Sequence, residues 1–260
     1  FVDYSVEIEV VGKNTITVND SGSDKNFGRR HAIYLRTTTE NGKHFLKFSG
    51  NGTLNLNALV GIGIDSCDLE ISNITVNTAS SNRSSAGIYT SLDTSVRIEG
   101  AALNLNSSQG INASGGLLSI KNSNITITSI SEALYGAPLE IDASTVNATI
   151  SGEDVMGGFR SDGNCTIQNG SKLTLDGPLC RYGLASNASV TIDQSELYLN
   201  CPFEGIGGYP PPYVLSSEQA PVIKNGSKVT LIYYPGQAAT EKQPDCDASS
   251  ELSMKAVAAN

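Results

Sequence analysis

The sequence contains no tryptophan, only two histidines and two methionines, and few aromatic residues among its 260 positions. A compact α/β enzyme normally fills its core with larger side chains, so this composition argues against that class. No run of about 18 apolar residues occurs, which argues against a segment that inserts into a membrane. Basic residues are also scarce, and the formal net charge is −9. Nucleic acid or an anionic membrane as a partner would need a concentrated basic face, which this balance does not favour.

Several catalytic motifs are missing as well. Neither a G-x-S-x-G elbow nor a G-x-x-x-x-G-K-[ST] phosphate loop occurs. A Ser-His-Asp triad needs a histidine as its base, and His31 and His44 are the only histidines in the sequence. The sequence therefore favours a binding or structural protein over an enzyme.

The five cysteines are too few and too irregularly spaced for a disulfide framework or a zinc site with paired C-x-x-C ligands. We expect them to be small thiols, mostly buried. Cys180 and Cys201 lie 21 residues apart, about one repeat, and are candidates for stacked neighbours. Whether they are bridged depends on a Cα separation that spacing alone does not provide.

The apolar residues that are present are mainly Ile, Leu, Val and Ala, spread evenly between Gly, Asn, Ser and Thr, which is typical of short strands and tight turns. A block of three short strands recurs along the chain. One strand of each block ends in isoleucine, and these residues follow one another at spacings of 27, 22, 21, 26 and 25: Ile71, Ile98, Ile120, Ile141, Ile167 and Ile192.

This repeat predicts an all-β fold, a single-stranded right-handed parallel β-helix of about 7–9 coils with three short strands per coil. Coils of this kind stack about 4.8 Å apart. Leucine-rich repeats have a similar period, but their consensus and any helix-period segment are missing. A β-sandwich is the alternative on strand length, although it does not explain why the three-strand block recurs in phase.

Two columns of inward residues follow from the repeat. The six isoleucines above form one. The other takes one residue per coil from the third strand: Ile64, Ile88, Ile111, Leu134, Phe159, Leu184 and Ile206. We predict a β-helix domain over 1–234, with an irregular first coil (1–43), regular coils (44–206), a proline-rich loop (207–214) and a last coil (215–234). Residues 235–260 are expected to be a tail or terminal cap, with a short helix over Ser250–Ala258.

The motif G-[IL]-x-[AST]-[SDN], followed by a strand ending in Ile, carries a family resemblance. Its clearest related segment is FRSDGNCTI at 159–167. Over about residues 44–230 the chain resembles the pectate-lyase-like superfamily of right-handed parallel β-helices, and within it bacterial carbohydrate-binding β-helix proteins of cell surfaces. The resemblance implies this architecture more strongly than any activity, because fold and chemistry are separable.

Relatives of this type include polysaccharide lyases, polygalacturonases, sugar binders and adhesins. The hydrolases among them need clustered aspartates and a Gly-His-Gly segment, and this sequence has no Asp-Asp pair and no G-H-G. The lyases need acidic calcium ligands and a basic residue that abstracts a proton, so a calcium-dependent lyase stays an alternative, with calcium as its possible cofactor.

Candidate binding residues gather near the third strand of the fourth to seventh regular coils, where equivalent positions line up as ladders. Acids and arginines there suit sugar hydroxyls or a calcium ion, or form an ordinary solvated face. These residues are Glu132, Glu153, Asp154, Arg160, Asp162, Arg181 and Glu204.

Tyrosines occur in the same region. Tyr89 and Tyr135 are predicted to share one outward slot, with Asn112 between them, and Tyr182 lies close to that register. An exposed row of tyrosines can stack against sugar rings, although packing against the 207–214 loop is an alternative role.

Twelve positions match N-x-[ST], including Asn73, Asn124, Asn147, Asn187 and Asn225. We interpret them mainly as turn residues and stacked amides rather than as glycosylation sites, because asparagine tolerates left-handed geometry and forms ladders.

The leading hypothesis is a non-catalytic, secreted or cell-surface module that binds polysaccharide. The binding surface would be the ridge formed by coils four to seven, which makes many weak contacts. An export signal is not apparent at Phe1–Val11 and would have to lie outside this sequence. The alternatives are an adhesin or structural solenoid that binds a protein partner through 207–214, and the calcium-dependent lyase.

Overall fold

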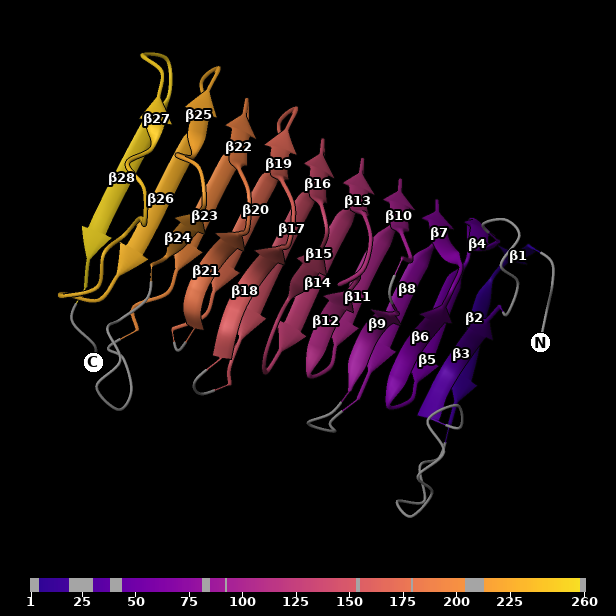
Figure 1. Ribbon diagram of the computed structural model, residues 1–260. Helices are drawn as coiled ribbons and strands as arrows, with labels where there is room; N and C mark the ends of the chain where they lie inside the picture. Colours follow the sequence, from indigo (N-terminus) through magenta and orange to yellow (C-terminus); the bar gives the residue numbers. More distant parts are fainter. Residues whose placement is uncertain are drawn as a thin grey trace.

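The computed structural model describes residues 5–18, 30–37, 44–80, 85–91, 93–152, 155–178, 180–203 and 213–257. These residues form three long sheets, A, B and C, in which every strand pairs in parallel with its neighbours (Figure 1). Within each sheet the strand number rises by three from one strand to the next, because each coil contributes one strand to each sheet; only the last step in sheets A and B is a rise of two, since among the described residues sheet C has no strand there. The chain is therefore a right-handed parallel β-helix, and eight of its coils carry all three strands.

Sheet A has ten strands: β1 (Val6–Val10), β4 (Phe45–Gly50), β7 (Asp68–Ser72), β10 (Val96–Glu99), β13 (Leu118–Lys121), β16 (Leu139–Asp142), β19 (Cys165–Gln168), β22 (Val190–Asp193), β25 (Val222–Lys224) and β27 (Asp245–Cys246). Sheet B also has ten: β2 (Lys13–Thr17), β5 (Thr53–Asn57), β8 (Thr75–Ala79), β11 (Ala102–Asn106), β14 (Asn124–Ser129), β17 (Thr145–Ile150), β20 (Lys172–Asp176), β23 (Glu196–Asn200), β26 (Lys228–Tyr233) and β28 (Glu251–Ala256). Sheet C has eight: β3 (His31–Arg36), β6 (Val60–Asp65), β9 (Ala86–Thr90), β12 (Gln109–Asn112), β15 (Leu134–Gly136), β18 (Val155–Ser161), β21 (Cys180–Ser186) and β24 (Leu215–Ser217).

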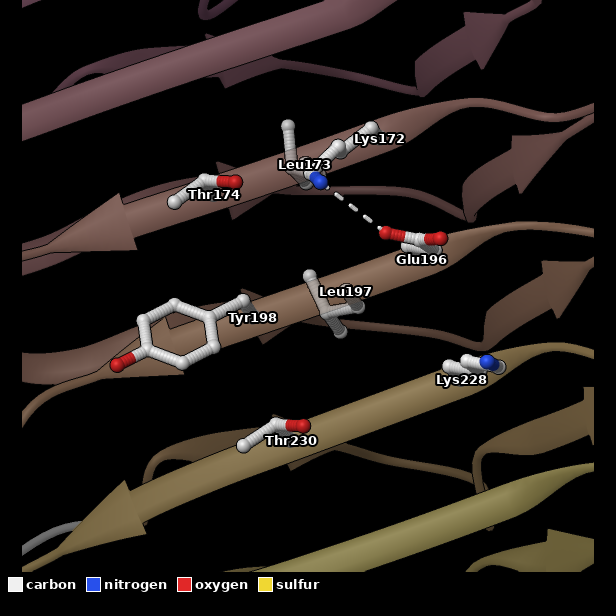
Figure 2. A pocket seen from close by; sticks show the side chains of 8 residues that line it. All are labelled: Lys172, Leu173, Thr174, Glu196, Leu197, Tyr198, Lys228 and Thr230. Carbon is white, nitrogen blue, oxygen red and sulfur yellow. Dashed lines mark ion pairs between the residues drawn. The ribbon is translucent and has the colours of Figure 1, made fainter.

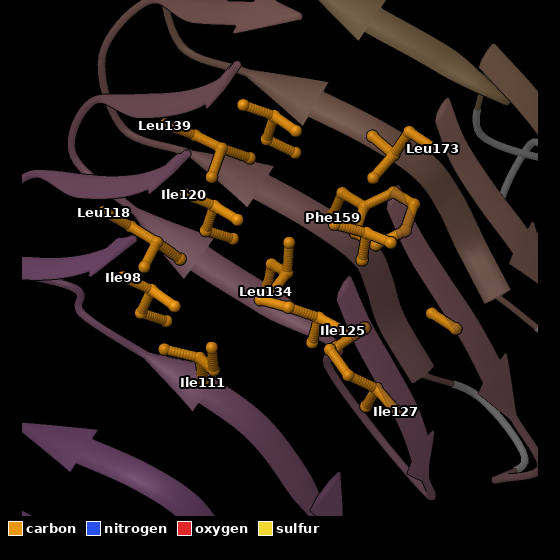
Figure 3. Close-up of a cluster of buried hydrophobic side chains, with 14 of the residues drawn as sticks. Ile98, Ile111, Leu118, Ile120, Ile125, Ile127, Leu134, Leu139, Phe159 and Leu173 are labelled. Carbon is orange, nitrogen blue, oxygen red and sulfur yellow. The ribbon is translucent and has the colours of Figure 1, made fainter. Parts of the chain in front are cut away.

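The isoleucine column predicted from the repeat is confirmed in sheet A. Ile71, Ile98 and Ile120 are paired strand to strand, and the same register continues to Ile192. Phe48 extends the column at one end and Ile223 at the other, and the column is buried throughout. Figure 3 shows part of this core, with Ile98 and Ile120 on neighbouring strands. The column is part of one continuous apolar core to which all three sheets contribute, and burial of such a core between stacked coils stabilises the solenoid.

The second predicted column is correct in sheet C except at its two ends. Ile88 pairs with Ile62, not with Ile64, and Ile64 pairs instead with Thr90. Both isoleucines of β6 are buried, so a period-two pattern cannot distinguish them, and the register of the neighbouring strand decides. At the other end Leu184 pairs with Leu215, while Ile206 lies outside the described residues.

The short helix expected over Ser250–Ala258 is wrong. Residues 251–256 form β28, which pairs with β26. Their side chains alternate in polarity, and Leu252 and Met254 pair with the inward residues Val229 and Leu231. The sheets thus continue beyond residue 234, into the segment expected to be a tail or cap.

All five cysteines are free thiols, and four of them are buried. Cys180 and Cys201 are neighbours that share a hydrogen bond but no disulfide. Burial raises the pKa of the Cys165 thiol to about 12, so this side chain behaves as a small apolar core residue.

Asparagine has two roles in the coils, as the turn and ladder interpretation predicted. Asn73, Asn169 and Asn225 have positive φ angles of 58°, 57° and 58° at corners of the coil. On the outer face of sheet B, the amide of Asn77 donates to Asn55 and the amide of Asn104 donates to Asn77, each at 2.8 Å. Within the described part of the chain, no helix is long and apolar enough to cross a membrane.

Candidate functional site

The candidate site lies on the outer face of sheet C, where one side chain per coil forms a column. Tyr89 pairs with Asn112, Asn112 with Tyr135, and Tyr135 with Arg160. The prediction that Tyr89 and Tyr135 share an outward slot with Asn112 between them is therefore confirmed. All four side chains are half-buried, so each rests on the sheet and still reaches solvent.

The column begins two coils before Tyr89, at Tyr34, which was not predicted. Tyr34 pairs with Gly63, and Gly63 pairs with Tyr89, so Tyr34 belongs to the same row. Its side chain is 40% exposed. The signal was present, because Ile33-Tyr34 has the same apolar-tyrosine order as Ile88-Tyr89 and Leu134-Tyr135. It was missed because the first coil lacks the regular turn spacing of the later ones.

Tyr135, Arg160 and Asp162 form a compact cluster at one end of this column. The Tyr135 hydroxyl donates a hydrogen bond to Asp162, and the Arg160 guanidinium lies 4.4 Å from the Tyr135 ring centroid. Arg160 Nη2 also donates to Asp162 Oδ1 at 3.2 Å. Because the tyrosine and the arginine bind the same carboxylate and stack on each other, each holds the other in place.

Two further side chains complete the cluster. Asn187, on the following coil, donates to Asp162 Oδ1 at 3.0 Å. Glu132 Oε1 lies 3.9 Å from Arg160 Nη1, on the side of the guanidinium that Asp162 leaves open. The cluster therefore presents two carboxylates, one guanidinium, one amide and one phenol within reach of solvent.

Burial sets the electrostatics of the cluster. It raises the pKa of Glu132, with the charge of Asp162 acting in the same direction and Arg160 opposing it. Burial, followed by the hydrogen bond to Asp162, raises the pKa of Tyr135 to about 12. Tyr135 therefore stays a neutral phenol at physiological pH. Its ring offers an apolar face, and its hydroxyl is already occupied as a donor.

A similar arrangement occurs at the start of the column. Arg36 Nε lies 3.1 Å from Asp65 Oδ2, and Ser91 Oγ donates to Asp65 Oδ1 at 2.6 Å. Burial, the Asp65 charge and a hydrogen bond to Asp65 raise the pKa of Tyr34, against the opposing effect of Arg36. The two arrangements have the same spacing. Tyr34 pairs with Gly63, and Asp65 follows Gly63 by two residues. Tyr135 pairs with Arg160, and Asp162 follows Arg160 by two residues.

Tyr182 does not lie in the column of Tyr89 and Tyr135. Arg160 pairs with Ala185, so Ala185 is the residue of β21 that continues the column. Tyr182 lies three residues before Ala185 and pairs with Gly157. Tyr182 and its neighbour Arg181 are half-buried on β21. Glu153, Asp154 and Glu204 lie outside the described residues, as does all of the 207–214 loop except Tyr213 and Val214.

A shallow pocket of about 400 Å³ lies on the outer face of sheet B and was not predicted (Figure 2). Tyr198, which is 37% exposed, stands there between Thr174 and Thr230 of the neighbouring strands. Lys172 and Glu196 form an ion pair of 3.2 Å at its edge. Tyr198 is nearly as exposed as Tyr34 of sheet C, at 37% against 40%.

Among the residues that the structure describes, no three His, Cys, Asp or Glu side chains are grouped so that they could hold a metal ion. Glu132 and Asp162 instead both face Arg160. Because three of the predicted acidic residues fall outside the described ranges, calcium binding stays a prediction.

Comparisons with known protein families, with curated proteins and with solved structures found no match.

Proposed function

We propose that this protein is a non-catalytic module that binds polysaccharide along the outer face of sheet C. The observation that carries the proposal is the cluster of Tyr135, Arg160 and Asp162, a phenol ring, a guanidinium and a carboxylate held together at the surface. Aromatic faces suit the apolar faces of sugar rings, and charged hydrogen-bonding groups suit their hydroxyls. The resemblance to carbohydrate-binding β-helix proteins supports the same class of ligand and a secreted or cell-surface location.

Binding is favoured over catalysis because of how the two carboxylates are used. One guanidinium engages both Glu132 and Asp162, at 3.9 Å and 3.2 Å, and Asp162 accepts two further hydrogen bonds, from Tyr135 and Asn187. Carboxylates committed in this way position groups rather than transfer protons. The repeated coils add weak contacts along an extended chain, so affinity arises from their number.

A pull-down against soluble and insoluble polysaccharides, with and without calcium, tests the proposal. The wild-type protein is compared with Tyr135→Ala, Arg160→Ala and the matched control Tyr198→Ala. We expect retention on at least one polysaccharide, loss of retention in the first two variants, and no change in the control. If Tyr135→Ala and Arg160→Ala bind as well as wild type, the outer face of sheet C is not the binding surface. Absence of binding to every polysaccharide would favour a solenoid that binds protein partners.

A further inference from the structure

Tyrosine recurs on every second coil over the first five coils of the sheet C column. The strand register places Tyr34, Tyr89 and Tyr135 in one row, and the coils between them carry Gly63 and Asn112. Because neighbouring strands are about 4.8 Å apart, successive tyrosines are about 9.6 Å apart, and the row spans about 19 Å. The period belongs to the outer face alone, since the inward residue directly before each member of the row is apolar on every coil: Ile33, Ile62, Ile88, Ile111 and Leu134.

The tyrosines at the two ends of the row are held in place. The Tyr34 ring packs against His31, with 4.8 Å between ring centroids, and Tyr34 is linked to Asp65. The Tyr135 ring is fixed by Asp162 and Arg160. A side chain at position 63 would collide with the His31 ring, which occupies the space that a Cβ would need, so only glycine fits there. A ring held by its neighbours loses little conformational entropy when a ligand binds, which favours affinity.

The charged groups along the row carry no net positive charge. Arg36 pairs with Asp65, and Arg160 lies between Glu132 and Asp162, so the five charged groups leave no excess of positive charge. The whole chain carries a formal charge of −9. A polyanionic sugar chain would gain nothing electrostatically from this surface, and a neutral chain loses nothing.

We infer that the row binds a neutral, β-1,4-linked pyranose chain that runs along the axis of the solenoid, with every second sugar against a tyrosine. This inference rests on the proposed function and specifies its ligand. In a β-1,4-linked chain, successive sugars turn over, so the same ring face recurs at every second sugar, at a distance close to two coil spacings. An α-1,4-linked chain curves into a helix and does not present its rings at this interval in a straight line.

Isothermal titration with cellohexaose, maltohexaose and polygalacturonate tests the linkage and the charge. We expect cellohexaose to bind more tightly than the other two. Tyr89→Ala removes the central contact and should weaken cellohexaose binding about threefold to tenfold, the range for one aromatic stacking contact. Tyr198→Ala removes an exposed tyrosine of sheet B, outside the row, and should have no effect.

A double variant tests the period itself. Tyr89→Asn combined with Asn112→Tyr keeps the composition of the row but moves the central tyrosine by one coil. It should bind cellohexaose as weakly as Tyr89→Ala, while far-ultraviolet circular dichroism and thermal unfolding confirm that the coils are intact. Wild-type affinity in this variant would overturn the two-coil match.

The outcomes separate this inference from the proposed function. If maltohexaose or polygalacturonate binds at least as well as cellohexaose and Tyr135→Ala abolishes that binding, the linkage assignment is overturned and the proposed function stands. If none of these chains binds and the polysaccharide pull-down is also silent, both are overturned.

Discussion

The backbone N–H of Ser144 donates a hydrogen bond of 3.2 Å to the hydroxyl of Ser171, on the next coil. The same contact is made from Ser123 to Ser144, from Ser171 to Ser195 and from Ser195 to Ser227. These serines are buried at the corner between sheets A and B, directly after a residue or pair with positive φ. The ladder satisfies backbone donors at a turn where no strand partner is available.

Replacing Ser171 by alanine should lower the free energy of unfolding by about 1–3 kcal/mol, because the buried N–H of Ser144 loses its acceptor. The Ser171 hydroxyl also donates to the Gln168 carbonyl at 2.6 Å, a bond that is lost as well. Urea denaturation measures the effect. Ser253→Ala, at an exposed position of β28, is the control and should change stability by less than about 0.5 kcal/mol. Equal stabilities of the two variants would show that the ladder contributes nothing.

Asn77→Ala should break the amide ladder on sheet B, because Asn77 both donates to Asn55 and accepts from Asn104. The ladder is only partly buried, so we expect a loss of about 1 kcal/mol in urea denaturation. Asn147→Ala is the matched control, since Asn147 is an exposed residue in the same outward column of sheet B but outside the ladder. A loss of the same size in both variants would indicate that strand propensity, not the amide contacts, causes the effect.

Glu132→Gln should change how stability depends on pH. Burial raises the pKa of Glu132 in the folded protein, so the folded state holds this proton more tightly than the unfolded state does. The wild type therefore loses stability as the pH rises from about 4.3, the unfolded value, through the higher folded pKa. The glutamine variant lacks this loss, and its stability relative to wild type should rise over that window and then level off. Denaturation at a series of pH values measures the difference, and a difference that stays constant contradicts the assignment.

Asp247→Asn should show the opposite dependence. The backbone N–H of Asn225 donates to Asp247 at 2.7 Å and, with Ser249 and Ser250, lowers the pKa of Asp247 to about 2. Since this value lies below the unfolded value of about 3.9, the contribution to stability is present at neutral pH and is lost as the pH falls toward about 2. The variant should exchange its amide hydrogens around 225–250 faster than wild type at neutral pH, and the two should converge in acid. Faster exchange in the variant that persists at the acidic limit would count against the ionic origin of the effect.

The column of isoleucines was predictable because each coil must bury one residue at the same place, which fixes both the residue type and the interval. The asparagine corners were predictable for a related reason, since few other residues accept a positive φ. Tyr89 and Tyr135 could be aligned from their place after an inward residue. Tyr34 follows the same rule, but an irregular first coil hid it.

The sequence contains a pattern that marks the serine ladder, but it indicates only the corners and not the hydrogen bonds of the serines. The N-G-S segments at 169–171 and 225–227 match a glycosylation pattern, yet Ser171 and Ser227 are fully buried and accept backbone hydrogen bonds from the preceding coil. Their spacing indicates a corner, and only the stacked coils reveal what the hydroxyl binds.

The sequence by itself determined the architecture, because a repeated three-strand block with apolar inward residues on each strand can bury these side chains only by stacking coil on coil. The tertiary structure decided the register and the site. Pairing of neighbouring strands selected Ile62 over Ile64, turned residues 251–256 into a strand, and brought Asp162 within reach of Tyr135, 27 positions away in the chain. The physical reason is that alternation specifies which face a residue occupies, whereas its neighbours on that face depend on coil lengths that differ from one turn to the next.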